Sequence, residues 1–145
     1  MDANTCPTPS ELHLAISESW HKDLAAAEAS ELSSVTGFSS AVRMLIATAT
    51  AELATNILRY AGHGELTLRV LRESERIGIE ICAIDNGCGI KDIEMAMQDH
   101  FTTTPGSLGL GLPSVRRMMD DFEINSAPDR GTRVLARKWR NLDHH

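Results

Sequence analysis

Hydrophobic and polar residues alternate along residues 12–16, 66–70 and 77–81, and a period of two predicts β-strands. The polar turn RESE joins the last two stretches, so they are expected to form an antiparallel hairpin. Residues 122–125 and 132–139 are predicted as a second hairpin around the turn APDRG. The chain is therefore expected to contribute five strands to a sheet.

The segments between these predicted strands have the hydrophobic periodicity or the composition of helices. Residues 20–32 are rich in Ala, Glu and Leu, and Gly37 is a plausible stop. Ser39 or Ser40 is predicted to cap a long helix that ends near Tyr60 and has one apolar face. A short helix is predicted at residues 90–99, and another follows the glycine-rich segment, with Pro113 in its first turn. Hairpins with helices grouped between them predict an α+β, two-layer sandwich with the helices on one face of the sheet.

Composition narrows the class of protein. The 145 residues suit one domain, with residues 1–10 and 141–145 as tails around a domain at 11–140. The net charge of −6 argues against non-specific nucleic-acid binding. No stretch approaches the ~20 apolar residues of a membrane span, and the N-terminus lacks the pattern of a secretory signal. Three cysteines without zinc-like spacing favour a reducing cytoplasm, and we expect a cytoplasmic protein.

Three glycines precede the predicted helix at residues 112–122, in the stretch PGSLGLGLP. A P-loop would need Lys and Ser or Thr after the last glycine, but Leu112 and Pro113 follow Gly111. A dinucleotide fingerprint would need glycine where Ser114 stands. A glycine-rich loop before a helix N-terminus still favours an anion such as phosphate, and a plain surface loop is the alternative.

Two further groups of residues carry candidate chemistry. Glu52 and Asn56 are four residues apart and share one helix face; the amide oxygen suits Mg²⁺ and the carboxylate suits proton acceptance. Asp85 ends a predicted strand and is followed by Gly87 and Gly89, an arrangement that leaves room for a flat ligand such as adenine. Each group alone has a simpler explanation, namely a solvated helix face and a common turn.

Taken together and in this order, the three groups resemble the boxes of the GHKL ATPase superfamily, with Gly131-Thr132 as its last, shorter box. Four longer stretches resemble the anti-sigma-factor serine/threonine kinases, and within them the stressosome switch kinases: ELATNILRYAG, DNGCGIKDIEMAMQD, LGLGLPSVRRMMDDFEI and GTRVLARKW. We find no phosphoacceptor helical region of a histidine kinase, and this length leaves no space for the transducer domains of gyrase-like relatives. The resemblance implies the Bergerat ATP-binding fold, with a mixed, mostly antiparallel sheet.

The resemblance also implies a role for each motif residue. Asn56 would hold Mg²⁺ at the ATP phosphates, and Glu52 would be the catalytic base. Asp85 would bind adenine with support from Thr132. The remaining ATP-binding positions would line the base pocket or form the lid over the phosphates: Gly87, Gly89, Gly106, Leu108, Gly109 and Gly111. Thr102, Thr103 and Thr104 would lie in that lid without an assigned role.

The implied function is a Ser/Thr protein kinase that phosphorylates STAS-domain stressosome proteins and, once released, activates a PP2C-type phosphatase or another output protein. One alternative is a nucleotide-dependent protein that sequesters a sigma factor or another partner with little catalysis. A second is an ATPase subunit of a histidine kinase, which would transfer phosphate to His. Pairing of two chains through the first helix and a redox role for Cys88 are left open.

Overall fold

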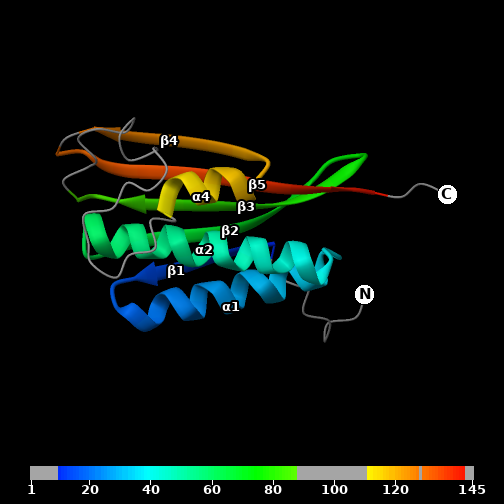
Figure 1. Cartoon of the computed structure of the whole chain (residues 1–145), viewed down its shortest axis with the longest axis horizontal. Helices are drawn as coiled ribbons and strands as arrows, with labels where there is room; N and C mark the ends of the chain where they lie inside the picture. Colours follow the sequence, from blue (N-terminus) through cyan, green and yellow to red (C-terminus); the bar gives the residue numbers. More distant parts are fainter. Residues whose placement is uncertain (1–9, 88–110, 128, 143–145) are drawn as a thin grey trace, which may run out of the picture.

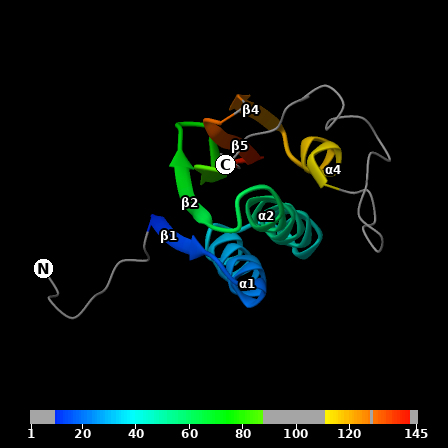
Figure 2. The same ribbon diagram turned by 90° about the vertical axis from the view of Figure 1, so that its left-hand side faces the viewer.

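The computed structural model describes residues 10–87, 111–127 and 129–142. They form a five-stranded sheet covered on one face by three helices (Figures 1 and 2). The elements follow one another as β1 (Glu11–Ile16), α1 (Ser19–Val35), α2 (Ser40–Tyr60), β2 (Gly64–Arg72), β3 (Arg76–Asp85), α4 (Gly111–Met118), β4 (Asp121–Ala127) and β5 (Gly131–Asn141). The predicted α+β sandwich is therefore confirmed. The helix predicted at residues 90–99 lies outside the described residues.

The strand order is β1-β2-β3-β5-β4, and all four ladders among the described residues are antiparallel. The expectation of a mixed sheet is thus corrected for this part of the chain. The pairing of β3 with β5 joins segments far apart in the sequence, and it places Asp85 directly opposite Thr132. Because opposite residues share a face, both side chains point toward the helices.

The core lies between the sheet and the helices. Leu66, Leu68, Ile79 and Ile81 are fully buried on the helix-facing side of β2 and β3, as their alternation predicts. From α2, the side chains of Ile46, Ala49, Leu53 and Ile57 pack into the same core cluster.

Helix α2 begins as expected after Ser39, whose hydroxyl accepts a hydrogen bond from the Val42 amide at 3.3 Å. By length and composition alone α2 is long and apolar enough to cross a membrane, so the expectation that no stretch qualifies was too strong. One such helix is weak evidence, since the core helix of a folded domain passes the same test. Its buried residues here face the sheet, as those of a core helix do.

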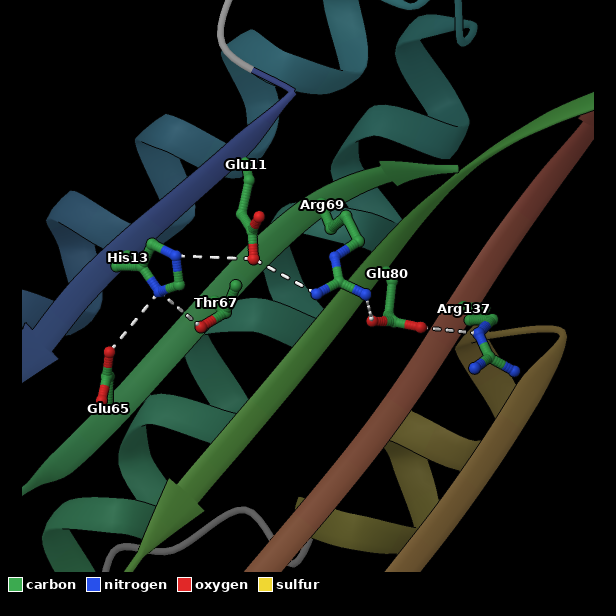
Figure 3. A network of polar contacts seen from close by, with 7 residues as sticks. All are labelled: Glu11, His13, Glu65, Thr67, Arg69, Glu80 and Arg137. Atoms are coloured by element: carbon green, nitrogen blue, oxygen red, sulfur yellow. Dashed lines mark hydrogen bonds and ion pairs between the residues drawn. The ribbon is translucent and has the colours of Figure 1, made fainter. Parts of the chain in front are cut away.

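The other face of the sheet carries a chain of charged side chains (Figure 3). Glu80 is buried at its centre, with the Nε atom of Arg137 at 2.8 Å and an amino group of Arg69 at 3.6 Å. Glu11 accepts a hydrogen bond from Arg69 at 3.2 Å, and this contact raises the pKa of Arg69. The remaining members of the network, at the β1 and β2 side of the face, are His13, Glu65 and Thr67.

Candidate nucleotide site

Asn56 is the most informative polar residue of the helix layer. Its side chain is almost fully buried in the last third of α2, at 9% exposure. Its Nδ2 amide has no hydrogen-bond partner among the described residues. Leaving a buried donor unpaired costs about 1–3 kcal/mol, so this amide is poised for a group that the protein itself does not provide.

Gly111 brings the third motif next to this amide. A Cβ atom placed on Gly111 would lie 3.7 Å from Asn56 Oδ1, so the first residue of α4 adjoins the amide oxygen. The N-terminus of a helix favours anions, and its free N–H groups are donors for phosphate oxygens. An amide oxygen is a hard, neutral ligand of the kind that Mg²⁺ takes together with phosphates. The residues present at this point therefore fit a magnesium–phosphate group.

Glu52 lies one helical turn before Asn56 on α2, as the spacing predicted. Its side chain is half-buried, and among the described residues it forms no hydrogen bond or ion pair. No group of three His, Cys, Asp or Glu side chains in the described part of the chain converges as a metal site. Glu52 is therefore an unengaged carboxylate, and any metal near Asn56 would take its other ligands from elsewhere.

Asp85 occupies the end of β3 and is 6% exposed. Its Oδ1 atom accepts a hydrogen bond from the Gly87 amide at 3.0 Å, which turns the chain at the end of the strand. A Cβ atom on Gly87 would lie 2.6 Å from the Cβ of Ala61, so only glycine fits against the end of α2. Gly87 thus holds the second motif close to the helix that carries the first.

Thr132 is the second residue of the neighbouring strand β5, where it lies opposite Asp85, and it is 8% exposed. Its hydroxyl lies 2.7 Å from the Ser126 hydroxyl, which donates to the carbonyl oxygen of Gly131 at 3.1 Å. Either hydroxyl can be the donor in the contact between Ser126 and Thr132. The Thr132 hydroxyl keeps acceptor lone pairs in either case, and the Asp85 carboxylate is an acceptor as well, which suits the exocyclic amine of adenine.

The backbone of Gly131 explains why glycine precedes this threonine. Gly131 has φ of 83°, and a Cβ atom there would collide with the backbone carbonyl of Asp85. A cavity of about 300 Å³ opens at these strand ends, and Asp85, Ser126 and Thr132 line it together with Arg130 and Arg133. Glu52 and Asn56 do not line this cavity.

The structure thus places six of the predicted positions: Glu52, Asn56, Asp85, Gly87, Gly111 and Thr132. It brings Asn56 to Gly111, Asp85 to Thr132, and Gly87 to the end of α2. The predicted positions Gly89, Gly106, Leu108 and Gly109 lie outside the described residues, as do Cys88 and Thr102–Thr104. Ser126 was not predicted; only the register of the second hairpin, which sets it opposite Thr132, could have indicated it.

This arrangement of an α+β sandwich with a buried amide, a strand-end carboxylate and a glycine-threonine turn fits a nucleotide-binding domain. Residues 41–140 match the family of histidine kinase-, DNA gyrase B- and HSP90-like ATPases, and the chain belongs to this family. It is similar to the serine/threonine-protein kinase RsbT of Bacillus subtilis, with 44% identity over 71% of this chain and 77% of the relative.

Two further relatives are anti-sigma F factors. That of Caldanaerobacter subterraneus is 37% identical over 65% of this chain and 68% of its own, and that of Thermoanaerobacter sp. is 36% identical over 68% and 71%. The prediction of the GHKL superfamily, and within it of the anti-sigma-factor kinase family, is confirmed. The expectation of an enzyme of the serine/threonine kinase type is confirmed at the level of the family.

Proposed function

We propose that this chain is a serine/threonine protein kinase and switch protein that transfers the γ-phosphate of ATP to STAS-domain scaffold proteins. The observation that carries the proposal is the pair on α2: a buried amide without a partner at Asn56, one turn after the unengaged carboxylate of Glu52. A protein that only bound nucleotide would have use for the amide but none for the carboxylate. The name of the similar kinase RsbT supports the same reaction class.

Each end of the site has a role in this proposal. Asp85 and Thr132 accept hydrogen bonds from the adenine amine, while Asn56 and the start of α4 hold the phosphates. Magnesium, when bound at Asn56, supplies charge neutralisation for the phosphates. Glu52 accepts the proton of the substrate hydroxyl while the hydroxyl oxygen attacks the γ-phosphorus of ATP. The bond between the γ-phosphorus and the oxygen that leaves with ADP breaks in the same step. Alignment and charge neutralisation account for most of the rate.

The partners in this proposal are proteins. STAS-domain stressosome proteins are the substrates, and the released kinase binds and activates a PP2C-type phosphatase or another output protein in the cytoplasm. A second candidate function is sequestration of a sigma factor with little catalysis. It is favoured by the anti-sigma F factors among the relatives, whose names describe binding and not phosphorylation.

Transfer of labelled phosphate from Mg-ATP to a STAS-domain protein encoded nearby tests the proposal. Wild type should give an acid-stable label on Ser or Thr, and Glu52→Gln should lower the rate by about 10²–10⁴-fold, the usual contribution of a positioned base. Glu123→Gln is the matched control, because Glu123 is exposed on the far strand β4 and should leave the rate unchanged. An acid-labile product would indicate transfer to His, and ATP binding without any transfer would favour the sequestering protein.

A further inference from the structure

Ser126 lies on the inner face of the edge strand β4, at a position where the strand otherwise carries apolar residues. The two preceding inward residues, Phe122 and Ile124, pack against the hydrophobic core. Ser126 continues their alternation, is half-buried, and stands opposite Thr132 in the register of β4 with β5. An apolar side chain would extend the core at this point and would be favoured by burial alone. The hydroxyl of Ser126 therefore has a role other than packing.

This hydroxyl connects two parts of the strand-end site. It lies 2.7 Å from the Thr132 hydroxyl and donates to the Gly131 carbonyl at 3.1 Å. Gly131 is itself fixed in place, because it has a positive φ and a Cβ atom there would collide with the Asp85 carbonyl. Ser126 thus ties the Thr132 hydroxyl to a rigid point of the β4–β5 turn.

Thr132 depends on this contact for the orientation of its side chain. Among the residues that the structure describes, Ser126 is the one hydrogen-bond partner of the Thr132 side chain. Asp85, which stands opposite Thr132 in the β3–β5 ladder, has a separate support, since its Oδ1 atom accepts a hydrogen bond from the Gly87 amide at 3.0 Å. The two acceptors assigned above to the adenine amine are therefore held by different groups: a backbone amide holds Asp85, and a side-chain hydroxyl holds Thr132.

The orientation of Thr132 affects which base this pair of acceptors can bind. Adenine has an amine at its 6-position, whereas guanine and hypoxanthine have a carbonyl oxygen there. The Asp85 carboxylate can only accept, but a threonine hydroxyl that is free to turn can offer its proton to a carbonyl oxygen. The contact with Ser126 occupies either the proton or a lone pair of this hydroxyl and fixes the place of its oxygen. It therefore limits how far Thr132 can adapt to a 6-carbonyl base.

From these observations we infer that Ser126 is a positioning residue for the base of the nucleotide. It holds the Thr132 hydroxyl where, together with Asp85, it accepts the amine of adenine, and it thereby increases the selectivity for ATP over nucleotides with a 6-carbonyl base. The inference rests on the adenine site of the proposed function and adds a residue that the sequence motifs do not contain. Ser126 lines the cavity at the strand ends and Glu52 does not, so the effect belongs to nucleotide binding and not to phosphoryl transfer.

Calorimetric titration of the full chain with Mg-ATP and with the magnesium complex of inosine triphosphate tests this inference. The variants Ser126→Thr and Ser126→Val form a matched pair, because they differ only in a hydroxyl for a methyl group and both residues suit a β-strand. Ser126→Val should raise the Kd for ATP about 3–10-fold, the range of one neutral hydrogen bond, and should not raise the Kd for inosine triphosphate. Ser126→Thr should keep the wild-type values for both nucleotides.

Steady-state kinetics with the STAS-domain substrate separates positioning from catalysis. At saturating ATP the Ser126→Val chain should transfer phosphate at the wild-type rate, while its KM for ATP rises with the Kd. Ser33→Ala is the control for loss of a buried hydroxyl, since the Ser33 hydroxyl donates to the Ala29 carbonyl at 2.6 Å on α1. This control should lower the free energy of unfolding without changing the ratio of the two Kd values. Circular dichroism verifies that each variant folds.

The inference is overturned by equal changes in the two Kd values of Ser126→Val, by no change in either, by the same loss of selectivity in Ser126→Thr, or by a lower rate at saturating ATP. A wild-type chain that binds ATP without transferring phosphate would refute the kinase reaction, and the ratio of Kd values would still decide the role of Ser126. A wild-type chain that binds ATP no better than inosine triphosphate would refute both the adenine site and the positioning role.

Discussion

Replacing Asn56 with leucine should stabilise the protein without nucleotide and abolish the stabilisation that Mg-ATP provides. Asn56 is 9% exposed and its Nδ2 amide lacks a partner among the described residues, so the nucleotide-free fold bears the desolvation cost of this amide. Leucine has the same branched arrangement of heavy atoms, with larger methyl groups, and no polar atom to satisfy. The same substitution removes the neutral oxygen that adjoins Gly111 and that we propose as the magnesium ligand.

The size of the effect follows from these terms. An unpaired buried donor costs about 1–3 kcal/mol, and imperfect fit of the new side chain offsets part of the gain. A net gain of about 1–2 kcal/mol corresponds to a Tm about 3–6 °C higher for a chain of this length. Wild type at ~100-fold excess of Mg-ATP over Kd should gain about 2.7 kcal/mol, and Asn56→Leu should gain nothing. Differential scanning calorimetry with and without Mg-ATP measures both quantities.

Thr50→Val is the matched control for this experiment. Thr50 is fully buried on the same helix, but its hydroxyl donates to the Ile46 carbonyl at 2.7 Å and is therefore satisfied. Its replacement should not raise the Tm, and the response to Mg-ATP should persist. A nucleotide-free Asn56→Leu chain that is less stable than wild type would refute the reasoning about the unpaired amide. A variant still stabilised by Mg-ATP would refute the assignment of Asn56 to the phosphate end of the site.

Two further substitutions test the strand ends and the open face of the sheet. Gly131→Ala should lower the free energy of unfolding in urea by about 2–4 kcal/mol and weaken ATP binding, because the new Cβ collides with the Asp85 carbonyl at a positive φ. The control Gly62→Ala, where φ is 81° and the space is open, should lower it by only about 1–2 kcal/mol and leave ATP binding unchanged. Equal effects of the two alanines would contradict this. Glu80→Ala should lower the free energy of unfolding by about 1–3 kcal/mol, which is less than the loss of a fully buried ion pair because Arg137 reaches solvent. A double-mutant cycle with Arg137→Ala should show that the two losses are coupled, and strictly additive losses would argue against the ion pair.

The sequence predicted the elements well because most of them follow simple periodicities. The alternation of Leu66 and Leu68 and of Ile77, Ile79 and Ile81 marks side chains that are buried on one face of the sheet. Ser39 caps α2 as its position indicated. The boundaries were less exact: α1 extends from Ser19 to Val35, beyond the predicted 20–32, and backbone hydrogen bonds to the carbonyl groups of Leu32 and Ser34 close its last turn.

Features that depend on pairing between distant strands were beyond the reach of periodicity. Alternation alone places Glu80 on the solvent side of β3, yet it is buried between Arg69 and Arg137 from two neighbouring strands. Ser126 became visible only through the register of β4 with β5. The mixed sheet expected from the family resemblance was wrong for the described strands, since every observed ladder is antiparallel.

The motif residues divide into those that hold the site together and those that act on a ligand. Gly87 and Gly131 have no side chain because the backbone of another motif occupies that space, at the end of α2 and at Asp85. They fix the distance between segments, so their substitution should disturb folding and binding together. Asn56, Asp85 and Thr132 instead keep polar atoms that the described fold leaves available. Variants of these three should separate binding from stability, and this separation is the physical mark of a site maintained for a ligand.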